Sequence, residues 1–311
     1  MTSDTGGLFM KKFLYLISAS VFFFSCNIES EITKSTSAVL ASDVTSIVIN
    51  NSYIPIDIEG VSGDKIIFSA GGNITLYTND KIINEPVIKI SGNSALLYFQ
   101  VFEDNQASFS FNSGASDKKR PWLRIQIPSS FSGELTVNNY GYNAKASIKN
   151  FPNLKAFTYL VIDSDLKTEN IKGDSATFYL NSADLTGSEF EFQNTTIYAQ
   201  TSCTISLSGF PGNLFVTTQN YMPFKAEYTR YNGEYIDIRT YSGGGEIILP
   251  KTASFQYDLF STTGTILLTG FDSKSAEVDL GNKKRGTVKN GGTPGEIYYN
   301  SYTNSFSVIG K

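Results

Sequence analysis

Two similar stretches of the chain place aspartate in a repeated context. They read TYLVIDSDL over 158–166 and TFYLNSADL over 177–185, so Asp165 and Asp184 each precede a leucine. Clustered carboxylates could bind Ca²⁺, or they could act as an acid and base pair on a polysaccharide. Aspartate is also a common turn residue, and two unpaired carboxylates stacked about 4.8 Å apart would repel each other. We therefore favour a turn role, keep Asp165 and Asp184 as the candidate metal ligands, and predict neither a bound metal nor a cofactor.

Four tyrosines recur at nearly constant spacing and are the second set of candidates. Tyr140, Tyr159, Tyr179 and Tyr198 follow one another about every 20 residues, which is a typical length for one structural repeat. Exposed tyrosines in a row could stack against a glycan or contact a protein partner. The same spacing would equally suit an aromatic stack that fills a core. The sequence leaves both interpretations open.

The chain contains no histidine. This excludes Ser-His-Asp triads, Cys-His dyads and histidine-ligated metals, while catalysis by carboxylates alone stays open. We assign no catalytic residue and predict that the protein is not an enzyme.

The 25 basic and 29 acidic residues give a net charge of −4. This charge lacks the basic excess of nucleic-acid-binding proteins, so we predict no nucleic-acid partner.

The N-terminal segment has the order of a secretory signal. Lys11 and Lys12 precede an apolar run over 13–24, which is too short to cross a bilayer as a helix but suits a signal peptide. We predict a signal peptide over residues 1–25, with Met10 as the true start.

The end of this segment resembles the lipobox of bacterial lipoproteins, because Ser25 precedes Cys26 and polar sequence follows. The resemblance implies cleavage before Cys26, attachment of lipid to that cysteine, and anchoring to a bacterial membrane in the cell envelope, facing either the periplasm or the cell surface. Residues 26–42 are rich in Ser and Thr and are expected to form a lipidated, flexible tether. With Cys26 lipidated, Cys203 has no disulfide partner and is expected to be a small buried residue.

Strand-forming sequence dominates from Val44 onward. Short runs rich in Val, Ile, Phe and Tyr alternate with Gly, Asn and Asp, and no amphipathic helix is evident. Comparable positions recur at similar steps along the chain, at Tyr140, Tyr159, Tyr179, Tyr198, Tyr221, Tyr241, Phe260, Leu280 and Tyr299. A second set, Phe151, Phe210 and Phe271, recurs at a spacing equal to three such steps.

A fixed period of about 20 residues without helices predicts an all-β, single-stranded β-solenoid, in which each repeat is one rung. One step of this series, from Tyr198 to Tyr221, is longer than the others. It spans Pro211 and Gly212, where we expect a bulged loop. Residues 128–311 fit the period and form the predicted repeat domain. Residues 43–127 fit it less well and are expected to be early rungs or an N-terminal β cap. A β-sandwich is the alternative architecture.

Two segments share a wider pattern: WLRIQIPSSFSGELTVNNYGYNAKASI over 122–148 and GEIILPKTASFQYDLFSTTGTILLTG over 245–270. In each, a strand ends in Ile-Pro or Leu-Pro, and two further strands follow across a turn with Gly or Asn. This pattern resembles the bacterial adhesin-like β-solenoid domain family. The resemblance implies a β-solenoid at the cell envelope and assigns no functional residue.

These observations predict a lipid-anchored protein of the cell envelope that binds, adheres or acts as a scaffold. Its expected partners are the membrane, through lipid on Cys26, and a glycan or an envelope or host protein. Two alternatives stay open: a carbohydrate-active enzyme that uses carboxylates on the same fold, and a structural or stress-sensing component of the envelope.

Overall fold

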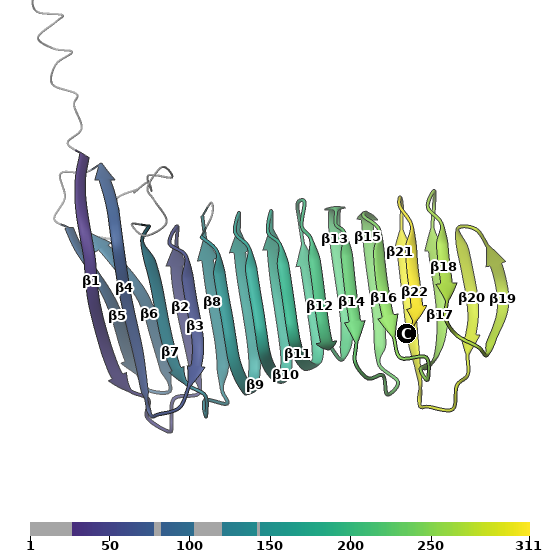
Figure 1. Cartoon of the computed structure of the whole chain (residues 1–311), viewed down its shortest axis with the longest axis horizontal. Coiled ribbons are helices and arrows are strands. Elements are labelled where there is room, and N and C mark those ends of the chain that lie inside the picture. Colours follow the sequence, from purple (N-terminus) through teal and green to yellow (C-terminus); the bar gives the residue numbers. More distant parts are fainter. Residues whose placement is uncertain (1–26, 78–81, 103–119, 142–143) are drawn as a thin grey trace, which may run out of the picture.

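The computed structural model describes residues 27–77, 82–102, 120–141 and 144–311, and every regular element in them is a β-strand (Figure 1). The described residues contain no helix long and apolar enough to cross a membrane. The strands are β1 (Asn27–Val39), β2 (Ser46–Ser52), β3 (Ile56–Val61), β4 (Lys65–Tyr77), β5 (Ile82–Ser91), β6 (Ser94–Phe102), β7 (Trp122–Pro128), β8 (Glu134–Tyr140), β9 (Ala146–Ile162), β10 (Leu166–Asn181), β11 (Leu185–Ala199), β12 (Ile205–Phe210), β13 (Asn213–Tyr221), β14 (Phe224–Tyr228), β15 (Tyr235–Ser242), β16 (Gly245–Leu249), β17 (Ser254–Ser261), β18 (Ile266–Thr269), β19 (Lys274–Leu280), β20 (Lys283–Val288), β21 (Pro294–Ser301) and β22 (Phe306–Gly310).

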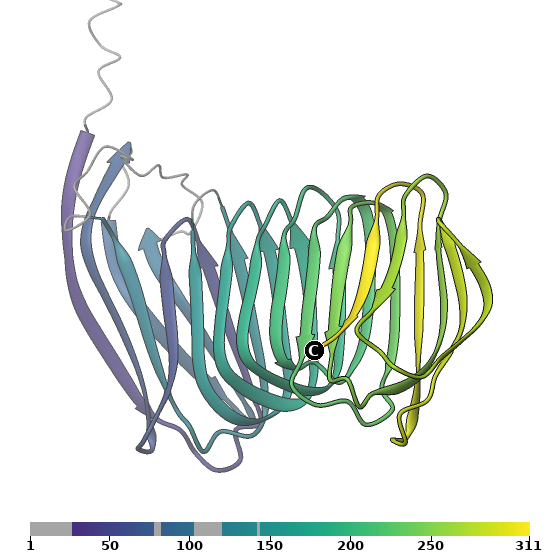
Figure 2. The same cartoon turned by 45° about the vertical axis from the view of Figure 1, so that its right-hand side comes forward.

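The strands form two facing layers, which Figure 2 shows one behind the other. Sheet I has the order β5-β6-β2-β8-β9-β10-β11-β13-β15-β21-β17-β20-β19. Sheet II has the order β1-β4-β7-β3-β9-β10-β11-β12-β14-β16-β22-β18. The long strands β9, β10 and β11 belong to both sheets, because each bends from sheet II into sheet I. A rung is one sheet I strand followed by one sheet II strand, so the predicted all-β solenoid is confirmed.

Alternation along each strand builds the core between the sheets. In sheet I, Val137, Tyr159, Phe178 and Ile197 lie in register on successive rungs and are fully buried. Rings from the two sheets meet in the middle, as in the stacked pair Tyr299 and Phe306, whose centroids are 4.0 Å apart. Because side chains of a strand point to opposite faces in turn, each rung contributes one apolar side to a continuous core.

The rungs do not all stack in sequence order. The last strands, β21 and β22, lie between β15–β16 and β17–β18 (yellow between green in Figure 1). Near the other end, β2 and β3 lie between β6–β7 and β8–β9. Leu280 is not on a parallel rung as its spacing predicted, because β19 and β20 form an antiparallel hairpin on β17. A period fixes the length of a rung, but it does not fix its neighbours.

The N-terminal region is part of the same solenoid. β1 pairs with β4 along its whole length, from Asn27 to Val39, and the Ile32 side chain of β1 is buried in the core. The predicted flexible tether over 26–42 is therefore wrong for residues 27–39, because the open side of β4 needs a strand partner. The described part of 43–127 supplies interleaved rungs rather than a separate cap. The predicted signal peptide, Met10 and Cys26 lie outside the described residues.

The long step in the repeat has a different origin from the predicted one. Thr196 pairs in register with Phe215 on the next rung, and their separation along the chain is that of an ordinary repeat. Phe215 pairs in turn with Asp237, and their separation along the chain is longer. The extra length lies in the connection 229–234, between β14 and β15. The predicted bulge at Pro211 and Gly212 is instead a short connection, made of only these two residues, between β12 and β13.

Candidate binding surface

The outer face of sheet I carries rows of like residues, because each rung repeats the same outward positions. Thr136, Thr158, Thr177 and Thr196 form one such row. In the next row, Tyr179 and Tyr198 are paired in register and stack with centroids 5.2 Å apart and planes 14° apart. These two rings are 44% and 43% exposed.

The four tyrosines with the regular spacing form neither a single outward row nor a single core stack. Tyr159 pairs with Phe178 rather than with Tyr179, and it lies fully buried in the core. A shift of one residue moves a side chain to the opposite face of a strand. The Tyr159 hydroxyl accepts a hydrogen bond from Asn139 at 3.0 Å, and burial raises its pKa well above the ordinary value near 10. Tyr140 is exposed, but it stands opposite Ile162 at the end of β8.

Further aromatic rings extend the exposed surface toward the C-terminal rungs. The ring centroids of Phe215 and Tyr235 are 5.4 Å apart, and those of Tyr235 and Tyr298 are 5.5 Å apart. We call Tyr179, Tyr198, Phe215, Tyr235 and Tyr298 the aromatic strip. It runs across five consecutive rungs of sheet I.

A hollow of about 240 Å³ opens on the strip between Tyr198 and Phe215. Its polar side is formed by Thr217, Asp237 and Arg239. Arg239 donates from Nε to Asp237 Oδ1 at 3.0 Å and from one terminal nitrogen to Oδ2 at 2.7 Å. This bidentate pair holds both groups in fixed positions beside the rings. The hollow therefore combines flat apolar faces with oriented donors and acceptors.

The hydroxyl groups of Tyr235 and Tyr298 and the guanidinium of Arg239 beside them keep their protons at neutral pH. The partial burial of Tyr235 raises its pKa above the ordinary value, and the negative charge of Asp237 adds to the effect. Burial likewise raises the pKa of Tyr298, and Glu296 adds to it. The hydrogen bond to Asp237 raises the pKa of Arg239. Tyr235 donates its hydroxyl to Asp237 Oδ2 at 3.5 Å and Tyr298 donates its hydroxyl to Glu296 Oε2 at 3.2 Å, so both present hydroxyl oxygens as acceptors, and Arg239 presents a guanidinium.

The paired aspartates lie at a turn. Asp184 donates its backbone N–H to Asp165 Oδ1 at 3.4 Å, and Thr204 donates its backbone N–H to Asp184 Oδ1 at 2.8 Å. The Lys145 ammonium is 3.5 Å from the Asp165 carboxylate. No cluster of three or more possible metal ligands occurs in the described part of the chain. These contacts join the turns of successive rungs, as expected for aspartate at corners.

Of the two cysteines, only Cys203 lies within the described residues. Cys203 is buried and unpaired, as predicted, and burial raises the pKa of its thiol. Cys26 lies outside the described residues, so its lipidation stays a prediction.

Sequence reasoning missed much of the aromatic strip. The spacing of the tyrosines does not point to Phe215, Tyr235, Asp237 or Arg239, although YIDIRT over 235–240 alternates outward Tyr, Asp and Arg with inward Ile, Ile and Thr. Reading every strand by alternation would have found the side chains. Only the structure reveals that β21 lies beside β15, which brings Tyr298 next to Tyr235.

A family model described as Toastrack DUF4097 matches residues 44–293. The chain belongs to this family. The match agrees with the resemblance to the adhesin-like β-solenoid family, and it includes the early rungs as well as the regular repeats. Comparison of the Toastrack chain with curated proteins gives no match.

Three solved structures are similar to this Toastrack protein. A proposed cell adhesion protein from Clostridium sporogenes shares 12% identity with a TM-score of 0.29, covering 90% of this chain and 100% of that one. A proposed adhesin from Parabacteroides merdae shares 8% identity with a TM-score of 0.37, covering 89% and 96%. A proposed adhesin from Parabacteroides distasonis shares 7% identity with a TM-score of 0.36, covering 89% and 97%.

Proposed function

We propose that this Toastrack protein is a lipid-anchored component of the bacterial cell envelope that binds a glycan on its aromatic strip without chemically changing it. The aromatic strip is the observation that carries the proposal. Sugar rings present flat C–H faces, and their hydroxyl groups need donors and acceptors at the rim. The stacked rings of Tyr179 and Tyr198, with Asp237 and Arg239 nearby, supply both kinds of contact.

The rigidity of the strip supports this proposal. Its side chains project from paired strands in the interior of a sheet, so their spacing is fixed before a ligand arrives. A preformed site loses little conformational entropy on binding. Sugar polymers repeat along their length as the rungs do, which suits a surface that continues from rung to rung.

The two carboxylates beside Tyr298 of the aromatic strip, those of Asp237 and Asp258, favour binding over catalysis. Asp237 is held by Arg239, and Asp258 accepts a hydrogen bond from Arg285 Nε at 3.0 Å. A glycosidase needs one carboxyl group that gives up a proton and a second one that acts as nucleophile or base. Both oxygens of the Asp237 carboxylate are bound by Arg239, so this carboxylate is not free to approach a glycosidic bond in either role.

The anchor rests on the sequence. Two lysines, a short apolar run and Ser25-Cys26 form the pattern on which lipidation of Cys26 is proposed. Metabolic labelling with radioactive palmitate should mark the wild type and should not mark Cys26→Ala. Label in both proteins, or in neither, would contradict the anchor.

The glycan proposal is tested with a glycan array followed by calorimetry on the oligosaccharide that binds most strongly. The double variant Tyr179→Ala/Tyr198→Ala should weaken binding at least about tenfold, since it removes both faces of the stack. The control is Tyr241→Ala/Tyr302→Ala, which removes another exposed stacked pair, at 5.5 Å and 10°, outside the strip. It should bind as the wild type does.

Three results would contradict the proposal. A blank array excludes glycans as the partner, and equal losses in the two double variants exclude the strip as the site. Shortened oligosaccharides after incubation with the wild type would instead support the carbohydrate-active alternative.

A further inference from the structure

A second exposed aromatic surface lies on the opposite side of the solenoid from the aromatic strip. It is on the outer face of sheet II, where β1, β4 and β7 lie side by side at the N-terminal end. Trp122 projects from this face, is the single tryptophan of the chain, and is 44% exposed. The functions proposed above do not use this residue.

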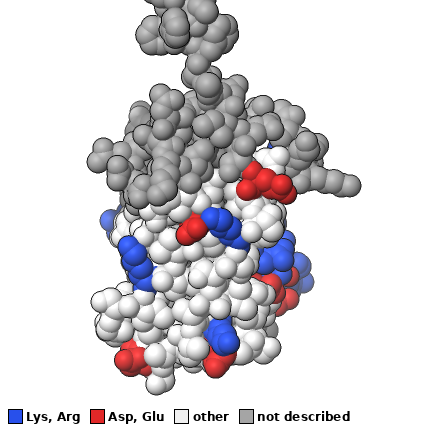
Figure 3. All heavy atoms as spheres, turned by 90° about the vertical axis from the view of Figure 1, so that its left-hand side faces the viewer, with Lys and Arg blue, Asp and Glu red and all other residues white. Residues whose placement is uncertain are grey.

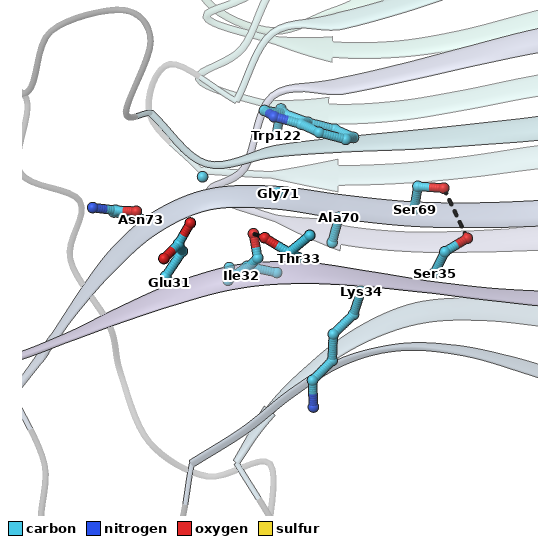
Figure 4. A pocket seen from close by; sticks show the side chains of 11 residues that line it. Glu31, Ile32, Thr33, Lys34, Ser35, Ser69, Ala70, Gly71, Asn73 and Trp122 are labelled. Atoms are coloured by element: carbon cyan, nitrogen blue, oxygen red, sulfur yellow. Dashed lines mark hydrogen bonds between the residues drawn. The ribbon is translucent and has the colours of Figure 1, made fainter.

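The indole ring of Trp122 lies flat on the sheet because residue 71 is a glycine. Gly71 of β4 stands in register with Trp122 of β7 and has no side chain. A methyl group on Gly71 would lie between 2.5 and 3.0 Å from three atoms of the ring, so the ring covers this glycine with its face (Figure 4). The opposite face of the ring is open to solvent and forms a flat apolar platform.

Polar side chains from β1 and β4 border the ring. Glu31 stands in register with Asn73, and Thr33 stands in register with the glycine under the ring. Figure 4 shows these side chains with Trp122 around a hollow of about 680 Å³. Alternation along β1 places Glu31 and Thr33 on the outer face, because Ile32 between them is buried. The hollow therefore has an aromatic wall and a polar rim.

The polar groups of the rim have unused hydrogen-bonding capacity. Among the residues that the structure describes, the carboxylate of Glu31, the amide of Asn73 and the indole N–H of Trp122 have no hydrogen-bond partner. Thr33 donates its hydroxyl to the Ile32 carbonyl at 2.8 Å, which leaves its oxygen as an acceptor. Donors and acceptors beside an apolar face match the hydroxyl groups and the C–H face of a sugar ring.

The charge that faces the hollow is negative. Its described lining includes two charged side chains, of which Lys34 points away and pairs with Glu85 on β5 at 2.7 Å. The other is Glu31, which makes no ion pair within the described residues. At the N-terminal end as a whole, Figure 3 shows basic and acidic side chains scattered over the described surface, with no large patch of one sign. A preference for a charged ligand therefore comes from Glu31 and from the ring, whose face attracts cations.

The position of Arg124 gives the hollow a direction. Its guanidinium lies 5.8 Å from the centre of the Trp122 ring. Arg124 stands in register with Ser69, whereas Glu31 stands in register with Asn73, so the two charges lie on opposite sides of the ring along the strands. A cationic group on a bound ligand is attracted to the Glu31 side and repelled from the Arg124 side.

We propose that this hollow is a second binding site, which takes one pyranose ring of an amino sugar. The C–H face of the sugar lies on the open face of the Trp122 ring, and its protonated amine faces Glu31. Its hydroxyl groups bond to Asn73 and Thr33. Neither the aromatic strip on sheet I nor the lipid proposed for Cys26 takes part in this site.

The site is tested by titrating the full-length protein with methyl glucosaminide, methyl glucoside and methyl glucuronide at about pH 6, where the amine carries its proton. Trp122 fluorescence reports on the hollow directly, because the chain has no other tryptophan. We expect a saturable change with the amino sugar. Its association constant should exceed that of the neutral sugar at least about threefold, from an exposed ion pair and a cation–π contact. The acidic sugar should bind most weakly.

Two carboxylate variants test the choice of an amine. Glu31→Gln should remove the preference for the amino sugar and leave the affinity for the neutral sugar unchanged. Glu85→Gln is the matched control, because the Glu85 carboxylate faces Lys34 outside the hollow. It should keep the preference of the wild type.

Two further variants test the platform. Gly71→Ala keeps the fluorescent reporter but places a methyl group under the ring, so it should weaken binding of the amino and the neutral sugar alike, at least about threefold. Tyr179→Ala/Tyr198→Ala removes rings of the aromatic strip and should leave the titration of Trp122 unchanged. Circular dichroism checks that each variant keeps its strands.

The outcomes separate this site from the strip. No change in Trp122 fluorescence, together with no heat of binding in calorimetry, overturns the second site and leaves the strip untouched. Equal affinities for the three sugars in the wild type, or a preference that survives Glu31→Gln, overturn the assignment of an amino sugar. A glycan array that shows no ligand for the strip contradicts the proposed function, while a saturable titration of Trp122 still supports this site.

Discussion

Asn139 is buried at the end of β8, where polar groups from three rungs meet. Its amide donates to the Tyr159 hydroxyl and to Ser164 Oγ, both at 3.0 Å, and its oxygen accepts from Asn51 at 2.6 Å. A buried polar side chain is tolerated when its hydrogen bonds are complete. Asn139 therefore joins three consecutive rungs at a point where the backbone turns.

Replacing Asn139 with alanine should be costly. Asn139→Ala leaves the amide of Asn51 and the hydroxyl of Tyr159 with fewer partners in a place that water does not reach, so the free energy of unfolding should fall by about 3 kcal/mol. Urea denaturation measures the change. The adjacent Asn138 is a matched control, since it makes an exposed bond to Asn50 at 2.8 Å. Asn138→Ala should change stability by less than about 1 kcal/mol; similar losses in both variants would contradict the role of Asn139.

At the scale of elements, the repeat predicted the strands and their length, but not their order. The period follows from residues such as Tyr179 and Tyr198, which do occupy equivalent outward positions. Tyr159 and Tyr299 have almost the same spacing and point into the core, because a spacing that is uncertain by one residue cannot determine a face. β21 separates β15 from β17, and no local sequence signal encodes that insertion.

Removal of the last strand pair should damage the solenoid well beyond its end. A chain that stops before Pro294 loses β21 and β22, which lie between two rungs on each sheet. Rungs β15–β16 and β17–β18 would then face each other across a gap two strand spacings, or about 9.6 Å, wide. We expect rapid hydrogen exchange from β15 to β18, measured by mass spectrometry.

The hairpin β19–β20 provides the control for this truncation. It lies at the end of sheet I, and β19 is exposed on both faces. Replacing residues 274–288 with a short Gly-Ser linker should therefore leave exchange in β15 and β16 unchanged. Protection of β15 and β16 that survives loss of residues 294–311 would show that the inserted rung is dispensable.

At the scale of the whole molecule, buried tyrosines make stability sensitive to alkaline pH. Burial raises the pKa of Tyr159, Tyr228, Tyr231 and Tyr299 above the ordinary value near 10. Above pH 10 the unfolded chain loses these phenolic protons while the folded chain keeps them. The folded state then binds more protons, so its stability is greatest below pH 10 and falls as the pH rises.

The expected slope is up to about 1.4 kcal/mol per pH unit for each such tyrosine. Urea midpoints measured from pH 8 to 11.5 should be level at first and then fall. Tyr299→Phe removes one titrating group whose hydrogen bond, to the Gly243 carbonyl, is long at 3.3 Å. The urea midpoint of the Tyr299→Phe variant should fall less steeply above pH 10 than that of the wild type. Identical slopes in the two proteins would argue against this cause.

The insertion of β21 and β22 also affects how the molecule is made. A chain that is synthesised N-terminus first delivers residues 294–310 after the strands β15 to β20 that they pair with or follow. Until then, β15 and β17 have no correct neighbour between them, and pairing them directly would produce a solenoid that must reopen. Long-range pairings of this kind slow folding and leave strand edges open for longer. The two flanking rungs can therefore reach their final pairing only after residues 294–310 have been added to the chain.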